Sequence, residues 1–280
     1  MKLIMTLLVR DNADTLRENL EYHYKQGVDF VIATDNLSVD DSKSILMEYQ
    51  KQGRLHYIYE ASDTFNQAKW VTRMARMAAW RFGADWVINN DADEFWWPKN
   101  ANSLKAVFTD LPSGTNLVEA SRNNFLYRRD QSESLPFYQR MMYREVMSRN
   151  SEGEPLPAKI AHVARPWVKV GFGNHGVSRV GTAKLVKNLI EVFHFPIRSR
   201  AQIIEKVLKG GAALKRNENL NDQVATTWRS LYKELQNEGS IDGYIDENSF
   251  IKAELDAGVA DRKLLEDSRL RDYLVTLDIN

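Results

Sequence analysis

The chain has 280 residues, 43% of them apolar and 27% charged, which is enough to bury one large core with an appendage, or two small domains. It contains no cysteine, and this excludes disulfide bonds and thiolate metal sites, so any metal must be held by oxygen atoms or imidazole. Because the formal net charge is zero and no nucleic-acid-binding motif is present, we expect no nucleic-acid partner.

The first apolar run, Leu3–Val9, predicts a buried strand. We prefer this interpretation to a signal peptide, because Arg10-Asp11-Asn12 follows the run and no small-residue cleavage site does. No run in the chain approaches the roughly 18 apolar residues of a membrane-spanning helix. We therefore expect a cytoplasmic protein with at most peripheral membrane association.

A helix is expected after this strand. Thr15 and Glu18 have the spacing of a capping box, which predicts that Thr15 is the N-cap residue. The helix is expected to run to Gln26 and to stop at Gly27, since glycine adopts the left-handed conformation after a helix at little cost.

The same alternation repeats along the first hundred residues. Strands are predicted at residues 30–34, 55–59 and 86–89, and helices near residues 43–52 and 65–82, with Gly53 and Gly83 as stops. Strands that alternate with glycine-stopped helices are typical of βαβ units. The predicted fold class is therefore α/β, with a mostly parallel, Rossmann-like central sheet flanked by helices.

The pattern is looser after Pro98. Ser199 and Gln202 open a predicted helix that ends near Gly210-Gly211, and Trp228, Leu231 and Leu235 recur at helical spacing. These signals predict a main domain over residues 1–200 and a helical extension over residues 201–280. Further strands are predicted at residues 117–120, 160–164, 167–170 and 189–195.

Charge is unevenly distributed. From Lys159 to Arg216 there are twelve lysines or arginines and only two acids, whereas residues 217–280 contain fourteen acids and seven bases. One interpretation is that these are solvated helix faces that attract each other across the fold. The other is that the basic segment forms a wall facing a diphosphate or an anionic acceptor.

The motif Asp91-Ala92-Asp93-Glu94 directly follows the fourth predicted strand. In parallel sheets ligands bind beyond the carboxyl ends of the strands, where Arg10 and Asp35 also lie. Two carboxylates one residue apart can hold a divalent cation and leave its other side to phosphate oxygens. Alone the motif is a weak signal, and an acid-rich helix N-terminus is the alternative.

Two stretches and a later motif carry a family resemblance. Residues 9–40, which include the D-N-x-S-x-D pattern at 35–40, and residues 85–98, which include D-x-D-E-F, resemble glycosyltransferases of the GT-A fold, of the family 2-like and family 92-like type. The segment His194-Phe195-Pro196-Ile197-Arg198-Ser199 resembles a later motif of that group. The resemblance implies transfer of a sugar from a nucleotide-diphosphate sugar to a hydroxyl group, with inversion.

The resemblance also implies a divalent metal, Mn²⁺ or Mg²⁺, and a glycan or lipid-linked acceptor, as in the synthesis of surface glycans. It divides the main domain into a nucleotide-sugar half (residues 1–98) and an acceptor half (residues 99–200). The implied metal ligands are Asp91, Asp93 and His194.

The other site residues that we predict follow from this resemblance and from their places on the chain. Asp91 is also predicted to contact the donor ribose, and Glu94 to orient the donor sugar or to support the site from behind. The general base stays open among Asp130, Glu145 and His175, with Asp130, His175 and Glu94 as the catalytic candidates. The predicted substrate-binding residues are Arg10, Asp35, Lys69, Asp91, Arg198 and Lys206, of which Arg198 and Lys206 would neutralise the departing diphosphate.

Ordinary structural roles remain open for several of these residues. Asp35 has the position of a turn carboxylate, Lys69 that of an exposed lysine, and His175 that of a turn cap. Two other functions compete with the first. A sugar nucleotidyltransferase would carry a glycine-rich phosphate loop after strand one, but residues 10–14 contain no glycine. The second competing function is that of a non-catalytic nucleotide- or sugar-binding protein on the same scaffold.

Overall fold

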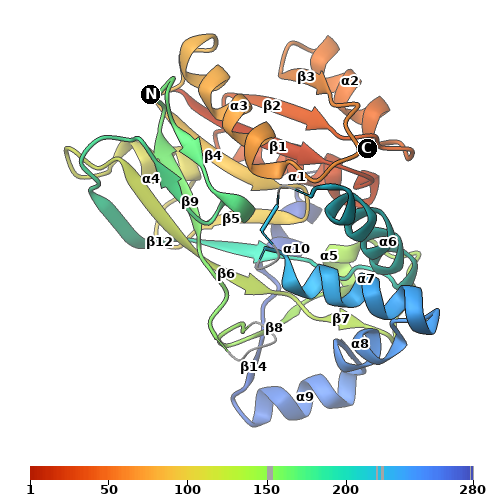
Figure 1. Ribbon diagram of the computed structural model, residues 1–280. Coiled ribbons are helices and arrows are strands. Elements are labelled where there is room, and N and C mark those ends of the chain that lie inside the picture. Colours follow the sequence, from red (N-terminus) through yellow and green to blue (C-terminus); the bar gives the residue numbers. More distant parts are fainter. Residues whose placement is uncertain (150–153, 219, 222–223, 278, 280) are drawn as a thin grey trace.

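The structure is a computed structural model that describes residues 1–149, 154–218, 220–221, 224–277 and 279. Within this part of the chain the core is an eight-stranded sheet with the order β3-β2-β1-β4-β9-β6-β12-β5 (Figure 1). Its strands are β1 (Leu3–Val9), β2 (Phe30–Asp35), β3 (Leu55–Tyr59), β4 (Trp86–Asp91), β5 (Glu94–Pro98), β6 (Leu117–Asn124), β9 (Lys159–Val163) and β12 (Leu185–His194).

The first four strands pair in parallel, as their alternation with helices predicts. β9 runs antiparallel between β4 and β6, and β5 runs antiparallel to β12, so the sheet as a whole is mixed. The predicted α/β fold with helices flanking a central sheet is confirmed. The predicted bounds of β1 and β3 agree with the structure residue for residue.

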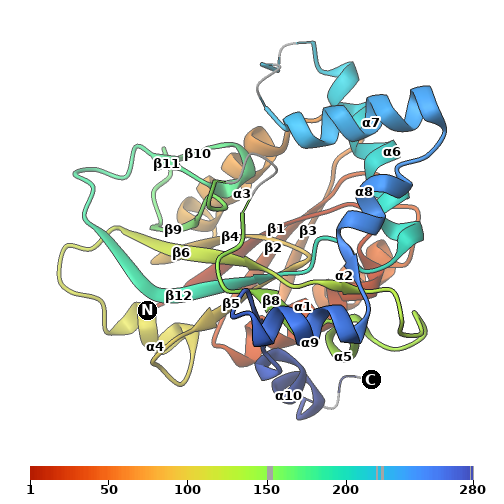
Figure 2. The same ribbon diagram turned by 90° about the horizontal axis from the view of Figure 1, so that it is seen from below.

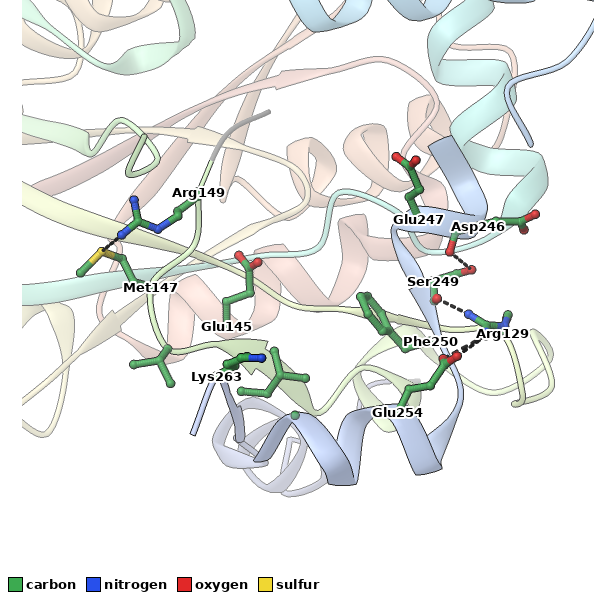
Figure 3. Close-up of a pocket in the computed structure, with 13 residues that line it drawn as sticks. Arg129, Glu145, Met147, Arg149, Asp246, Glu247, Ser249, Phe250, Glu254 and Lys263 are labelled. Carbon is green, nitrogen blue, oxygen red and sulfur yellow. Dashed lines mark hydrogen bonds and ion pairs between the residues drawn. The ribbon is translucent and has the colours of Figure 1, made fainter. Parts of the chain in front are cut away.

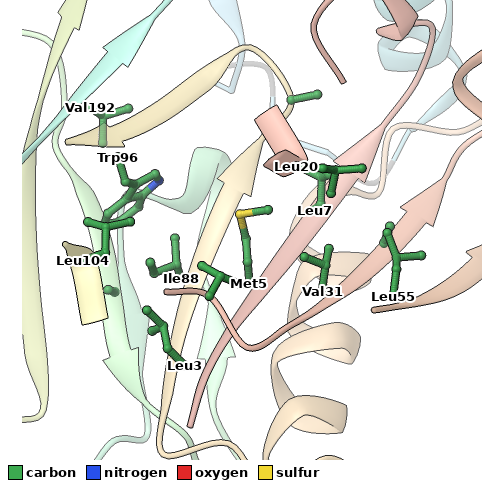
Figure 4. Packing of buried hydrophobic residues seen from close by; sticks show 14 of the residues in the cluster. Leu3, Met5, Leu7, Leu20, Val31, Leu55, Ile88, Trp96, Leu104 and Val192 are labelled. Carbon is green, nitrogen blue, oxygen red and sulfur yellow. The ribbon is translucent and has the colours of Figure 1, made fainter. Parts of the chain in front are cut away.

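Helices cover both faces of the parallel strands. α1 (Ala13–Lys25), α2 (Ser42–Lys51) and α4 (Leu104–Thr109) pack on one face, which contains Leu3, Met5 and Leu7 of β1 (Figure 4). α3 (Gln67–Trp80) packs on the other face, against Ile4 of β1. Side chains on both faces of β1 are therefore buried, which explains why this strand is a nearly continuous apolar run. The short pair β10 (Lys169–Val170) and β11 (Val177–Ser178) lies beside α3 (Figure 2).

The rest of the chain packs around a cluster of aromatic side chains. Phe95, Phe125 and Phe193 from the sheet region contact apolar residues of the C-terminal helices in this cluster. Two short strand pairs, β13 with β7 and β14 with β8, also join the last part of the chain to its middle. The elements concerned are β7 (Tyr127–Arg128), α5 (Phe137–Arg140), β8 (Tyr143–Glu145), α6 (Arg200–Arg216), α7 (Thr226–Glu238), α8 (Asp242–Glu247), β13 (Ser249–Phe250), α9 (Lys252–Ala260), β14 (Leu264–Glu266) and α10 (Arg269–Val275).

The C-terminal segment thus shares a core with the sheet. The division at residue 200 stays a prediction. Of the described helices, none is both long enough and apolar enough to cross a membrane.

Three local predictions are wrong. α1 begins at Ala13, and Thr15 lies inside it with its hydroxyl bonded to the Asn12 carbonyl, so the predicted capping box does not form. The strand predicted at residues 167–170 is reduced to its last two residues. α6 does not stop at Gly210-Gly211 but runs on to Arg216. A Cβ on Gly211 would lie 2.3 Å from the Cβ of Tyr232, so this glycine permits α7 to pack closely on α6.

Candidate functional site

The carboxyl ends of β1, β2 and β4 meet at one edge of the sheet, as their parallel pairing requires. Asp35 is the last residue of β2, Asp91 is the last residue of β4, and Arg10 directly follows β1. The sequence prediction that polar groups from separate segments gather at this edge is therefore confirmed. We call it the donor edge.

The basic segment forms the opposite wall of the donor edge. α6 approaches it directly, and the backbone nitrogen of Phe65 donates to the carbonyl of Ala213 in that helix. Arg200 pairs with Asp242 of the acidic segment, but more of the pairs of the basic segment are made with the first hundred residues, and this favours the interpretation of a basic wall. Five of its cations pair with acids of the first hundred residues: Lys159 with Asp91, Arg198 with Asp14, Lys206 with Asp93, Lys209 with Asp11, and Arg216 with Asp63.

Asp93 lies in the turn between β4 and β5, and it is only 5% exposed. Its Oδ2 accepts a hydrogen bond from Lys206 Nζ at 2.7 Å, and Arg198 Nη1 lies 3.6 Å away. Burial raises the pKa of this carboxyl, but Lys206 and the other neighbouring cations outweigh burial and hold the pKa well below its usual value. Asp93 is therefore a buried anion at neutral pH.

The second oxygen of Asp93, Oδ1, faces His194 Nε2 at 3.8 Å. His194 Nδ1 lies 2.7 Å from Asn124 Oδ1, an amide oxygen that can only accept, so the ring proton is on Nδ1. Burial lowers the pKa of His194 well below its ordinary value, which keeps the ring neutral. Nε2 therefore directs an unprotonated lone pair toward a carboxylate oxygen.

This arrangement fits a divalent cation in part. A carboxylate oxygen and an imidazole nitrogen are both metal donors, and Asn124 orients the ring as partners of histidine ligands commonly do. Asp91 does not join them, because its oxygens contact Lys159 Nζ at 2.6 Å and Asn174 Nδ2 at 3.3 Å. In the described part of the chain, no three His, Asp or Glu side chains are placed to hold one ion. The fit is thus for two protein ligands.

Asp91 and Glu94 share a buried lysine. Lys159, the first residue of β9, is 1% exposed, and its Nζ lies 2.6 Å from Asp91 Oδ2 and 2.9 Å from Glu94 Oε2. Arg122 Nη1 lies 3.6 Å from the other oxygen of Glu94. Burial raises the pKa of Glu94 to about 7, an effect that Lys159 opposes. The sequence does not predict that Lys159 and Arg122 belong to the site. Its only signal for Lys159 is the basic character of residues 159–216.

His175 follows the 3₁₀ turn η1 (Phe172–Asn174) and is half-buried. Its Nδ1 lies 2.9 Å from the carbonyl oxygen of Ala158, so the proton is on Nδ1 and Nε2 is free to accept. Burial, and then the charge of Lys159, lower the pKa of His175 to about 4. The neighbouring Gly173 has φ +64°, and a Cβ there would lie 2.5 Å from the His175 ring. A glycine at this position makes room for the imidazole.

Two of the predicted substrate-binding residues are fully buried and already have protein partners. Asp35 accepts hydrogen bonds from the Ser38 backbone nitrogen at 3.1 Å and from the Tyr57 hydroxyl at 2.9 Å. Arg198 donates to both oxygens of Asp14, at 2.6 and 2.9 Å. The role of Asp35 as a turn carboxylate is thus present in the structure, and its contact with a donor stays a prediction.

Two further predicted substrate-binding residues, Arg10 and Lys69, lie nearer the surface. Arg10 Nη1 donates to Asp63 Oδ1 at 2.8 Å and lies 3.4 Å from Asn36 Oδ1. Lys69 is exposed in the first turn of α3. A nucleotide at the donor edge can reach Arg10 only in competition with Asp63, whereas Lys69 faces solvent.

Among the described residues, no hydrogen bond or ion pair joins the side chain of Asp130 or Glu145 to the donor edge. Asp130 accepts hydrogen bonds from the Arg128 guanidinium at 2.9 and 3.0 Å and from the Lys252 backbone nitrogen at 3.0 Å. The bond from Arg128 lowers the pKa of Asp130 to about 2, which makes it a weak proton acceptor. Glu145 lines a separate cavity between β8 and the C-terminal helices (Figure 3).

Residues 5–199 match the model of glycosyltransferase family 92. No curated protein matches the chain.

Several solved structures are similar in fold at low sequence identity. The 1–349 fragment of TarS from S. aureus is 10% identical with a TM-score of 0.46, covering 86% of this chain and 76% of that one. Its complex with UDP-GlcNAc is 12% identical with a TM-score of 0.46, covering 84% and 77%. HddC from Yersinia pseudotuberculosis is 11% identical with a TM-score of 0.35, covering 73% and 97%.

Proposed function

Because the chain belongs to glycosyltransferase family 92, we propose that it transfers a sugar from a nucleotide-diphosphate sugar to a hydroxyl group of an acceptor. The observation that carries this proposal is the environment of Asp93. One of its oxygens faces the lone pair of His194, while the other is bound by Lys206 with Arg198 close by. Such a site combines a place for a cation with positive charge from the chain, and a diphosphate requires both.

Asp93 Oδ1 and His194 Nε2 would hold a divalent cation, Mn²⁺ or Mg²⁺, which when bound supplies positive charge to the diphosphate. Asp91 remains a proposed contact of the donor ribose. Its carboxylate is 31% exposed, although it is paired with Lys159. These assignments follow from the two free lone pairs of Asp93 and His194 and from the exposure of Asp91.

Lys206 and Arg198 are proposed to neutralise the leaving nucleoside diphosphate. Both cations lie within 3.6 Å of Asp93 Oδ2, and Lys206 is 34% exposed, so its ammonium can be shared with an incoming phosphate. Positive charge placed where the leaving group gains negative charge lowers the barrier for cleavage of the glycosidic phosphate bond. Arg198, which is fully buried, is expected to act through fixed charge at this position.

The acceptor hydroxyl must also lose a proton. We propose His175 as the base, because its neutral ring has Nε2 free as an acceptor and is partly exposed. Glu94 is 1% exposed and held between Lys159 and Arg122, so its proposed role is to support the site from behind. Direct attack by a deprotonated hydroxyl inverts the anomeric centre, and inversion is part of the proposal.

The test is a turnover assay on the full chain with a panel of nucleotide-diphosphate sugars, with and without Mn²⁺ or Mg²⁺. Metal-stimulated release of free nucleoside diphosphate is the expected result. Pyrophosphate formed from a nucleoside triphosphate and a sugar phosphate would instead identify a nucleotidyltransferase. Binding of nucleotide sugars with no turnover, including in the presence of acceptors, would contradict the proposal and favour a non-catalytic binding protein.

A further inference from the structure

A second hollow lies apart from the donor edge. It is an open cavity of about 700 Å³ between β8 and the following chain on one side and α8, β13 and α9 on the other. We call it the C-terminal cavity. Figure 3 shows Glu145 and Arg149 on one side and Glu247 and Phe250 on the other. Its volume is that of a site for a ligand of several hundred daltons.

The lining combines the aromatic ring of Phe250 with four carboxylates and with three cations, Arg129, Arg149 and Lys263, of which Arg129 is paired with Glu254. Among the described residues the side chains of Glu145, Asp246 and Glu247 make no hydrogen bond or ion pair. Phe250 is half-buried between them, and the exposed Met147 adds apolar surface. Aromatic faces with hydrogen-bond acceptors beside them suit sugar rings, which have apolar faces and hydroxyl groups at their edges.

The C-terminal cavity is connected to the donor edge through two hydrogen bonds. Ser148, between the lining residues Met147 and Arg149, accepts a hydrogen bond from the Asn124 backbone nitrogen at 2.8 Å. The side chain of the same Asn124 holds His194 Nδ1 at 2.7 Å. The wall of the cavity therefore contacts Asn124, the residue that orients the proposed metal ligand His194. Asn124 thus links the wall of the cavity to the donor edge.

We propose that the C-terminal cavity is the acceptor site and that it binds a neutral saccharide. This inference rests on the proposed function, since an acceptor site has meaning only for a transferase. The lining has four carboxylates against three cations, and this excess of negative charge disfavours a phosphorylated or otherwise anionic acceptor. For a neutral sugar the same groups accept hydrogen bonds from hydroxyls, and Phe250 packs against the face of a ring.

The absence of cysteine from the sequence permits a direct test by blocking the cavity. Met147→Cys places one thiol in the lining, and Trp80→Cys places one at a matched exposed position on α3, since these side chains are 57% and 66% exposed. Both variants are labelled with a bulky maleimide. Donor consumption is then measured with Mn²⁺, first without an acceptor and then with a panel of neutral and phosphorylated mono- and disaccharides.

The labelled Met147→Cys protein is expected to lose the saccharide-stimulated part of donor consumption by about tenfold or more, while acceptor-free hydrolysis stays within about twofold. The labelled Trp80→Cys protein should keep both activities. Phe250→Leu, which needs no label, is expected to raise the KM for the saccharide and leave hydrolysis unchanged.

Each other outcome has its own meaning. Equal stimulation in the two labelled proteins would overturn the location of the acceptor site. A parent protein that hydrolyses the donor but is stimulated by no neutral saccharide, or more strongly by phosphorylated ones, would overturn the acceptor class. A parent that consumes no nucleotide sugar at all would instead count against the proposed function.

Discussion

Acidic side chains of the donor edge and of the C-terminal cavity differ in their partners. Of the four acids that line the cavity, Glu254 is paired with Arg129. At the donor edge Asp91, Asp93 and Glu94 each lie within 3 Å of a lysine ammonium. In the cavity, Glu145, Asp246 and Glu247 have no such partner among the described residues and face solvent.

The difference follows from burial. Asp93 and Glu94 are nearly inaccessible, and a buried charge without a partner is too costly to keep, so the chain must supply cations from β9 and α6. Lys206, which is 34% exposed, is then available to a diphosphate, which replaces one anion by another. The carboxylates of the cavity are hydrated and can exchange water for sugar hydroxyls without breaking an ion pair. The donor edge is thus rigid and charged, and the cavity is open and adaptable.

Removal of the buried lysine should break the donor edge most severely. Lys159→Met leaves Glu94 buried with only Arg122 nearby, so we expect a loss of about 3–5 kcal/mol in the free energy of unfolding. The matched control is Lys187→Met, whose partner Glu119 is at 3.0 Å on the surface, with an expected loss of about 0–1 kcal/mol. Urea unfolding of both variants measures the difference. Similar losses would show that burial does not set the strength of these pairs.

Asp93→Asn tests the chemistry of the same edge. The amide keeps the shape but removes the negative charge and one proposed metal donor, so we expect metal-stimulated turnover to fall by about 10²–10³-fold. The fold is expected to survive, as measured by circular dichroism. Asp85→Asn, at an exposed carboxylate near the start of β4, serves as the control and should retain activity. Unchanged turnover in Asp93→Asn would remove the proposed metal role.

Lys206 separates the electrostatic contribution of α6 from that of the metal. In Lys206→Gln we expect kcat to fall by about 10- to 100-fold, because one charge that faces the leaving diphosphate is lost, while Lys206→Arg recovers part of the activity. Lys215→Gln, in the exposed last turn of the same helix, is the control. Release of nucleoside diphosphate under saturating donor measures kcat. An effect confined to the KM of the acceptor would contradict the assignment.

The first hundred residues show which parts of this fold can be predicted from the sequence. β1 is buried on both faces by helices that follow it closely in the chain, so a nearly continuous apolar run predicts this strand. Gly27, which has positive φ, in turn marks the end of the helix that follows β1. Gly211 carries the same local signal but has a different role, because it packs against Tyr232 of α7. α1 ends where Gly27 adopts a positive φ of +92°, whereas Gly211 is not among the glycines with positive φ and α6 continues through it.

The candidate site divides in the same manner. Asp91, Asp93 and Asp35 were predictable because each follows a strand whose carboxyl end lies at one edge. Lys159 was not, because it reaches Asp91 across 68 residues of sequence through the insertion of β9 between β4 and β6. Ion pairs between residues this far apart in the chain depend on the order of the strands in the sheet. The sequence of β9 does not indicate where that strand is placed in the sheet.

The smallest expected effect concerns the cavity and is the sharpest contrast with Lys159. Glu247 is exposed on α8 and has no partner among the described residues, so Glu247→Gln should change the free energy of unfolding by less than about 0.5 kcal/mol. Its carboxylate accepts stronger hydrogen bonds from hydroxyls than an amide oxygen does, a difference of about 1 kcal/mol. We therefore expect the KM for a neutral saccharide to rise by about fivefold, with acceptor-free hydrolysis unchanged.

Measurement of both quantities in one variant separates binding from stability. A matched exposed acid outside the cavity, tested as Glu238→Gln on α7, should change neither quantity. A large loss of stability in Glu247→Gln would mean that its carboxylate is part of the folded framework, as the carboxylates of the donor edge are. A rise in KM without a loss of stability requires a carboxylate that is unpaired in the free protein and hydrogen-bonded in the complex. This property distinguishes Glu247 from the carboxylates of the donor edge.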